Sequence, residues 1–170
     1  METPSIVNKK VKSSFYASGP AVVDAVTLEG LAKGPRLFIT REFFDTLQDM
    51  EIKNFIVPVK ENVYEILWPA FCYVDGNDCK IELINGFPHM FRPALNLWKK
   101  YKGSPIRIKK IYFNLMKIIV QGTLKYFECK DFLPEAKSYI EDYLIKNDLG
   151  RIMTANLMDP QKFKWYLWWI

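Results

Sequence analysis

The chain lacks the sequence features of a membrane protein and of a secreted protein. Within its 170 residues, no apolar run approaches the roughly 18 residues that a membrane-spanning helix needs, so we expect no membrane partner. The first residues, METPSIVNKKVKSS, contain no long apolar core of the kind that a signal peptide carries. We therefore expect a cytoplasmic protein whose thiols are reduced.

Cysteine is also scarce, which limits both disulfides and metal sites. The three cysteines, Cys72, Cys79 and Cys129, cannot all pair with one another, and the chain is not a small cysteine-dense scaffold. Cys72 and Cys79 could face each other across a predicted hairpin, but zinc would require more closely spaced ligands and two further ones. We expect no metal site.

The chain has little that is typical of an active site. His89 is the only histidine, and it lies beside Met90 and Phe91, an apolar setting that favours a structural role over a nucleophile triad. Neither the G-x-x-x-x-G-K-[ST] nor the G-x-G-x-x-G phosphate-binding motif is present. The neighbouring carboxylates Glu141 and Asp142 fall on the exposed side of a predicted helix, although an acid pair from distant strands stays open. We expect no catalytic residues and no cofactor, and an enzyme of an unrecognised type is the third alternative.

What the chain does have is enough apolar material for one substantial core. Apolar residues make up 49% of it and aromatic residues 15%, a composition that disfavours a disordered chain. At this length we expect a single domain over 1–170. Residues 1–35 are punctuated by glycine and proline and are predicted to form an irregular N-terminal arm.

The pattern of apolar residues and turns predicts an α+β domain with a mostly antiparallel sheet and about three helices. Thr40 is a good N-cap for a helix over 41–50, and Pro58 inside the next strand argues for an edge position in the sheet. Predicted helices cover 41–50, 94–103 and 134–147, and predicted strands cover 36–39, 55–59, 63–68, 71–74, 79–84, 106–113, 117–122, 123–128 and 162–170.

An acidic hairpin tip is one candidate partner-binding site. The sequence DGND at 75–78 is typical of a tight turn between two strands. Asp75 and Asp78 would lie at its tip, with Glu82 close by in the second strand. We expect these carboxylates to contact a basic partner.

Charge is divided unevenly along the chain, although the net charge is only +5. Residues 41–85 contain nine acidic and four basic residues, a net charge of −5. Residues 86–130 contain ten basic residues and one acidic residue, a net charge of +9. Such asymmetry indicates either a charged partner or two solvated faces that pair with each other.

The basic half contains a candidate nucleic-acid-binding segment over 98–117. Its cations alternate with aromatic residues, a combination that holds single-stranded nucleic acid through phosphate contacts and base stacking. Against this, Leu95, Trp98 and Tyr101 have the spacing of a helical core stripe, and no RNP-like or helix-turn-helix motif is present. The partner-binding candidates in this segment are Lys99, Lys100 and Lys102. The other cations of the segment are Arg107, Lys109, Lys110 and Lys117, and its other aromatic residues are Tyr112 and Phe113.

The stretch RLFITREFFDTLQDMEIKNFIVPVK, residues 36–60, is the most strongly patterned part of the chain. Its predicted helix has one apolar face, formed by Phe43, Phe44, Leu47 and Met50. Capping, a core face or a strand explains every patterned position, and none is left over for catalysis. This favours a scaffold that displays a charged surface.

The same stretch resembles a recurring segment of bacterial immunity proteins of polymorphic toxin systems. In those proteins a short strand that ends in Ser or Thr leads into a helix, and then into a strand that carries Asn before a hydrophobic residue and ends in Pro-Val. The matching residues are Leu37–Thr40, the helix over 41–50, and Ile52, Asn54, Phe55, Pro58 and Val59.

The resemblance implies a cytoplasmic protein that binds and blocks a toxin encoded beside it, and it implies no fixed set of binding residues. We therefore predict a non-enzymatic interaction protein whose partner is a cognate toxin. The expected mechanism is steric block together with charge complementarity, which speeds the encounter of the two proteins. Nucleic-acid binding through 98–117 is the alternative function.

Overall fold

The structure, a computed structural model, describes residues 34–73, 76 and 78–159. It contains a three-stranded antiparallel sheet together with helices, so the predicted α+β class is confirmed. The prediction of a mostly β domain with about three helices is wrong, because helices form the larger part of the described chain. The predicted arm over 1–35, apart from its last two residues, and the predicted strand over 162–170 lie outside the described residues.

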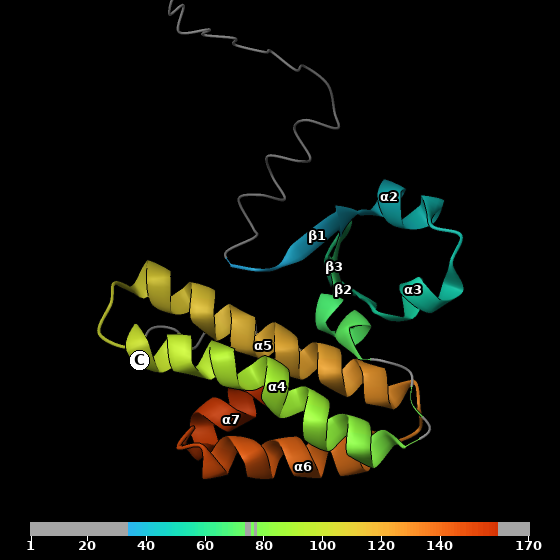
Figure 1. The fold of residues 1–170 in the computed structure, drawn as a ribbon. Coiled ribbons are helices and arrows are strands. Elements are labelled where there is room, and N and C mark those ends of the chain that lie inside the picture. The colour runs from blue at the N-terminus through green and yellow to red at the C-terminus, as the bar shows by residue number, and fades with distance from the viewer. Residues whose placement is uncertain (1–33, 74–75, 77, 160–170) are drawn as a thin grey trace, which may run out of the picture.

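The sheet and three short helices form one unit at residues 34–73, which we name the N-terminal lobe (Figure 1). Strand β3 lies between β1 and β2 and is antiparallel to both. The bounds are β1 Leu37–Thr40, α2 Arg41–Thr46, α3 Met50–Asn54, β2 Ile56–Lys60, β3 Val63–Ile66 and the 3₁₀ helix η1 Trp68–Cys72.

The predicted edge position of Pro58 is confirmed, since Pro58 lies in the outer strand β2. Pro58 is opposite Tyr64 of β3, and the register shifts between Pro58 and Lys60. Because a proline has no amide hydrogen to donate, it is tolerated at the edge of a sheet and not in its centre. The proline therefore helps to decide which strand is outermost.

The single helix predicted over 41–50 is wrong, because two short helices replace it. Thr40 caps α2 as predicted, and its Oγ1 accepts a hydrogen bond from the Phe43 amide at 3.3 Å. Helix α2 ends at Thr46, and the Asp49 side chain caps α3. A second capping residue within the predicted helix thus begins a new helix.

Division of the helix also changes its predicted apolar face. Phe44 is half-buried and stacks on Tyr64 of β3, with ring centroids 4.6 Å apart. In contrast, Phe43 is 53% exposed and Met50 is 69% exposed. The prediction of one continuous core face is therefore wrong, and Phe43 and Met50 reach solvent.

Four longer helices form the rest of the described chain, and α5 contacts each of the other three (Figure 1). Helices α4 and α5 run side by side in opposite directions, joined by a short turn, and α6 and α7 pack on the same bundle. The bounds are α4 Cys79–Lys100, α5 Ile106–Glu128, α6 Leu133–Lys146 and α7 Arg151–Met158.

Helix α5 is the largest difference from the sequence prediction, which divided it into three strands. Every residue from 116 to 124 is buried. A run that is buried on all sides shows no helical alternation of apolar and polar residues, and its β-branched residues then favour a strand. The structure contradicts the strands predicted over 71–74, 79–84, 106–113, 117–122 and 123–128.

Helix α4 continues through two prolines that the sequence prediction interpreted as breaks. Pro88 and Pro93 both lie inside it. Each proline removes a backbone donor from the helix, but the core face continues past them, with Phe87 and Phe91 fully buried. Burial of an apolar face stabilises helices more than local propensity does. The helix predicted over 94–103 is therefore only the last part of α4.

Helix α6 was predicted correctly, and its observed bounds lie within one residue of 134–147. Its core face carries Ala136, Ile140 and Leu144, which are fully buried. These residues recur every fourth position, the spacing of one helical face. The signal was clear here because the opposite face of the helix is polar and exposed.

A close contact joins the N-terminal lobe to α5. A Cβ atom added at Gly122 would come within 3.0 Å of Pro69 Cβ and 3.1 Å of the Ala70 backbone nitrogen. Beside this contact, the Tyr73 hydroxyl and Thr123 Oγ1 form a hydrogen bond of 2.9 Å. Glycine in the middle of α5 therefore allows the close approach of η1, and a larger residue there would have to displace Pro69 or Ala70.

We predict that Gly122→Val lowers the free energy of unfolding by about 1–3 kcal/mol, the usual cost of overpacking. The matched control is Gly103→Val, because an added Cβ at Gly103 meets nothing within 4 Å, and it should change stability by less than about 0.5 kcal/mol. Urea denaturation measures both variants. Unchanged stability of Gly122→Val would show that η1 does not pack on α5.

Candidate partner-binding surface

The acidic hairpin tip predicted from the sequence is wrong, because Asp78 caps helix α4. The Oδ1 atom of Asp78 accepts hydrogen bonds from the amides of Lys80 and Ile81, at 2.9 Å and 3.0 Å. A carboxylate in this position satisfies free donors of the first turn and complements the helix dipole. Asp75, the other residue of the predicted tip, lies outside the described residues.

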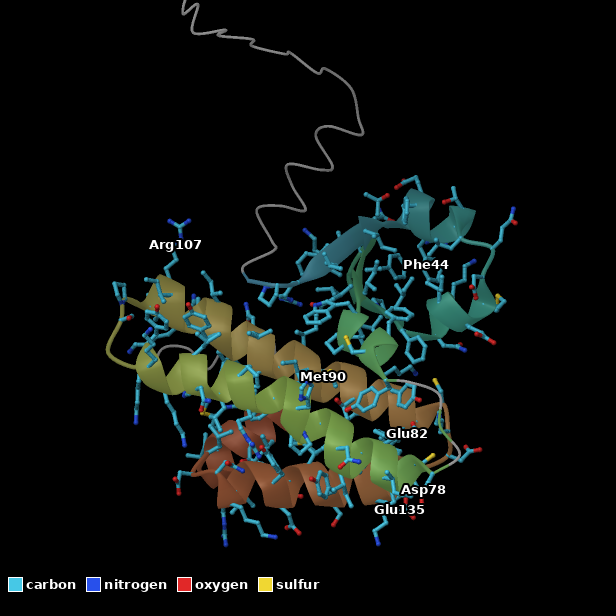
Figure 2. The ribbon with its side chains drawn as sticks, in the orientation of Figure 1. Phe44, Asp78, Glu82, Met90, Arg107 and Glu135 are labelled. Carbon is cyan, nitrogen blue, oxygen red and sulfur yellow. The ribbon has the colours of Figure 1, made fainter. Side chains whose placement is uncertain are left out.

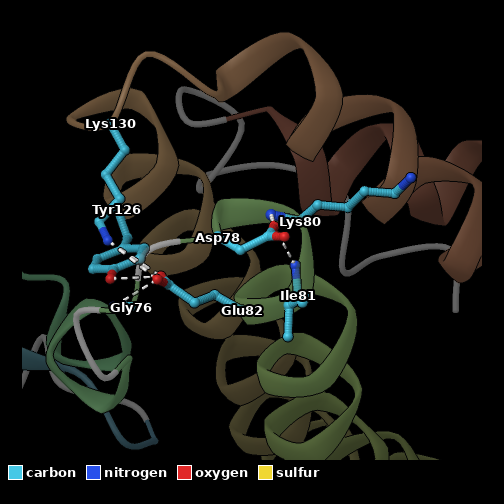
Figure 3. A network of polar contacts seen from close by, with 7 residues as sticks. All are labelled: Gly76, Asp78, Lys80, Ile81, Glu82, Tyr126 and Lys130. Atoms are coloured by element: carbon cyan, nitrogen blue, oxygen red, sulfur yellow. Dashed lines mark hydrogen bonds and ion pairs between the residues drawn. The ribbon is translucent and has the colours of Figure 1, made fainter.

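Glu82 belongs to a polar network that joins α4 to the end of α5 (Figure 3). Its Oε1 accepts a hydrogen bond from the Gly76 amide at 2.7 Å, and its Oε2 accepts one from the Tyr126 hydroxyl at 2.9 Å. The Lys130 ammonium lies 3.2 Å from the same Oε2. The Glu82 side chain is only 11% exposed, so its carboxylate serves internal contacts. The prediction that these carboxylates lie at or beside a hairpin tip is therefore wrong for both Asp78 and Glu82.

The predicted basic residues gather at the other end of the long helices, around the turn between α4 and α5 (Figure 1). Figure 2 shows Arg107 projecting from this end, far from Asp78 and Glu82. No acidic residue lies between 99 and 110. Six cations lie in this turn or in the adjoining ends of α4 and α5, and we name them the basic end. Lys99, Lys100, Lys102 and Arg107 are exposed, and Lys109 and Lys110 are half-buried.

The aromatic residues of 98–117 face the core or one another. Trp98 and Phe113 are buried, and their ring centroids are 6.2 Å apart. Tyr101 and Tyr112 stack on each other with centroids 4.9 Å apart. Stacking on nucleic-acid bases needs exposed rings. The buried rings of Trp98 and Phe113 therefore cannot serve as a stacking platform for bases.

Lys117, the last cation of the segment, is also removed from the surface. It lies in the middle of α5 and its side chain is fully buried. A buried ammonium cannot contact phosphates of a docked nucleic acid without rearrangement of the core. The candidate cations of the sequence analysis are therefore reduced to the six of the basic end.

A cleft of about 1060 Å³ adjoins the basic end. It is lined by Trp98, Lys99 and Lys102 of α4, and by residues 148–153 and Asn156 from the start of α7 and the connection before it. This cleft was not predicted from the sequence, because no motif marks residues 148–156 and their position depends on how α6 and α7 pack on α5. The cleft brings an apolar cavity next to exposed cations.

His89 is exposed on α4, so the apolar setting predicted for it is wrong. Its sequence neighbour Phe91 is fully buried, and residues two positions apart lie on nearly opposite sides of a helix. His89 borders a depression of about 420 Å³ together with Asn85 and Arg92. It is a surface residue of the outer face of α4.

The cysteines are free thiols, and the predicted hairpin that would have paired two of them is absent from the described residues. Cys72 ends η1, whereas Cys79 begins α4. Burial raises the pKa of the Cys129 thiol, which lowers the fraction of reactive thiolate. In the part of the chain that the structure describes, no group of three or more histidine, cysteine or carboxylate side chains is placed to hold a metal ion.

Comparisons with known proteins and structures identified no relative of this chain. No protein-family model matches this chain, and no significant match was found among curated proteins or among solved structures. Among the helices that the structure describes, none combines the length and apolar content that a bilayer-spanning segment requires. The functional argument therefore depends on the surfaces described above.

We predict that Glu82→Ala lowers the free energy of unfolding by about 1–3 kcal/mol, because the Tyr126 hydroxyl and the Lys130 ammonium lose their shared acceptor. Lys99→Ala at the exposed basic end should change it by less than about 0.5 kcal/mol. Chemical denaturation with circular dichroism compares the two. An equally stable Glu82→Ala protein would contradict the structural role of the network and return Glu82 to the list of surface candidates.

We also predict an alkaline loss of stability that depends on Tyr73. Burial raises the pKa of the Tyr73 hydroxyl above its ordinary value of about 10. The folded state holds this proton more tightly than the unfolded state does. The protonated hydroxyl therefore contributes fully to the free energy of unfolding below the ordinary pKa, and this contribution is lost as the pH rises above it. Tyr73→Phe should therefore lose less stability than the wild-type protein between about pH 9 and pH 11, as measured by thermal unfolding. If thermal stability fell equally with pH in the two proteins, Tyr73 would not be the source of the alkaline loss.

Proposed function

We propose that this chain is a non-enzymatic binding protein that neutralises a protein toxin, as an immunity protein does. The observation that carries the proposal is the basic end, where six cations gather with no acidic residue among them in the sequence. A surface of this kind attracts an acidic partner surface and speeds the encounter. The proposed mechanism is occlusion of the toxin, without a catalytic step.

The N-terminal lobe gives separate support. Residues 36–60 carry the resemblance to immunity proteins, and they form the expected order of strand, helical segment and strand. Thr40 and Pro58 have the capping and edge roles that the pattern implies. The lobe also exposes Phe43 and Met50, whose apolar side chains are accessible to a partner.

The proposal places the main electrostatic contact on cations and not on the acidic residues expected from the sequence. Asp78 and Glu82 hold the start of α4 and its junction with α5. Lys99, Lys100 and Lys102 are exposed. The partner surface that complements the chain best is therefore acidic.

Nucleic acid is the second candidate partner, because the cations of the basic end would also bind phosphates. With Trp98 and Phe113 buried, phosphate contacts would dominate over base stacking. Such binding would be weak at physiological salt, independent of sequence and strongly dependent on ionic strength. Binding to oligonucleotides of any sequence thus distinguishes this alternative, because association with an acidic protein is salt-dependent as well.

We predict that Lys99→Glu, Lys100→Glu and Lys102→Glu together abolish protection of bacterial cells against a toxin encoded beside the gene. The triple variant changes the net charge from +5 to −1, which reverses electrostatic steering and should lower the association rate by about tenfold or more. Growth of cells that co-express the two proteins measures protection. Surface plasmon resonance at low and high salt measures the association rate.

The control carries Lys60→Glu, Lys80→Glu and Lys137→Glu, three exposed lysines outside the basic end, and has the same net charge. It should retain protection. If the control loses protection as completely as the basic-end variant, net charge and not the basic end governs binding, and the proposed surface is wrong. Salt-sensitive binding to an oligonucleotide, without protection against any neighbouring gene product, would favour the nucleic-acid alternative.

A further inference from the structure

The cleft beside the basic end has an apolar interior. Trp98 and Leu149 are only 4% and 3% exposed and form its inner wall, whereas Ile152 is 79% exposed at its outer side. Met153 is half-buried between these levels. The cleft therefore offers apolar contact area from its depth to its mouth, which is how small-molecule sites are lined.

Charge around this cleft is predominantly positive. Lys99, Lys102 and Arg151 line it, and Asp148 is the single carboxylate among the residues that do so. Asn156, which is 6% exposed, contributes one amide to the lining. An apolar cavity with an excess of cations at its border favours a ligand that is apolar at one end and anionic at the other.

The volume of the cleft argues for a whole molecule and not for one side chain of a partner. At about 1060 Å³, it is slightly larger than the range of roughly 300–1,000 Å³ that is typical of small-molecule sites. A single aromatic anchor from a docked protein would leave most of it unfilled. A ligand with an extended chain would fill the space between Leu149 and Ile152 far better.

We propose that the cleft binds a small amphiphilic anion, an aliphatic chain that ends in a carboxylate. The chain lies against Trp98, Leu149 and Met153, where it removes apolar surface from water. The carboxylate lies at the mouth, where the ammonium groups of Lys99 and Lys102 and the guanidinium of Arg151 neutralise it. This binding activity goes beyond the proposed neutralisation of a toxin and does not depend on it.

Two probes with the same chain and opposite head groups test the proposal on the full-length protein. Dodecanoate and dodecyltrimethylammonium are titrated below the concentrations at which they aggregate, with isothermal titration calorimetry as the readout. We expect dodecanoate to bind at one site and at least about tenfold more tightly than the cation, the scale of one charge-assisted contact. Acetate, which carries the head group without the chain, should not bind detectably.

Variants of the cleft separate the contribution of its cations to binding from the contribution of its apolar space. Lys99→Glu with Lys102→Glu should weaken dodecanoate binding by about tenfold or more, whereas the matched pair Lys80→Glu with Lys137→Glu should leave it unchanged. Gly150→Trp should also weaken binding, because an added Cβ at Gly150 meets nothing within 4 Å and the indole would occupy the cleft. The control for this bulk is Ala155→Trp, at an exposed position of the helix that follows Gly150, α7. Circular dichroism confirms that each variant is folded before it is titrated.

Three results would overturn the proposal. Equal affinity for the two head groups would mean that the surfactant chain partitions into apolar surface without recognition of charge. No binding of dodecanoate by the full chain would show that the cleft is not a ligand site. Binding that arises only after residues 160–170 are deleted would identify that segment of the chain, and not a small anion, as the native occupant.

Discussion

Burial of the middle of α5 on all sides is the constraint on which the rest of the structure depends. From residue 116 to residue 124, more than two helical turns, every residue is buried. The N-terminal lobe covers one side through η1, and α4, α6 and α7 cover the others. Even polar groups are drawn into this core, as when Gln121 Nε2 donates a hydrogen bond of 2.7 Å to the Leu157 carbonyl. The lobe and the cleft therefore share α5 as their common support.

This central helix also separates two kinds of charge. Near its C-terminal end, Glu82 and Lys130 form an ion pair of low exposure that holds the start of α4 beside the end of α5. Near its N-terminal end, four cations of the basic end are exposed, and two of these, Lys99 and Lys102, line the cleft. The Glu82–Lys130 pair stabilises the fold, whereas exposed cations such as Lys99 and Lys102 remain available to other molecules.

The sequence predicted those elements whose local signals agree with their final environment. The Thr40 cap, the edge strand with Pro58 and the whole of α6 follow from capping, the missing amide and a one-sided apolar face. The middle of α5, residues 116–124, was predicted as strands because its burial on all sides removes the helical period. The DGND turn was read as a hairpin, although an aspartate at its end serves equally as a helix cap. Lys99 and Lys102 were found by charge, but the cleft beside them depends on long-range packing that spacing does not contain.

Native-state hydrogen exchange along α5 tests this account most directly. Amides from 116 to 124 should be the most protected of the described chain and should exchange only through global unfolding, since no side of this segment opens to water. Amides of α2 and α3, helices that contain no buried residue, should exchange orders of magnitude faster. If residues 116–124 instead exchanged as fast as α2, the lobe and the cleft would have no common rigid support. The separation of internal charges from the basic end would then have no structural basis.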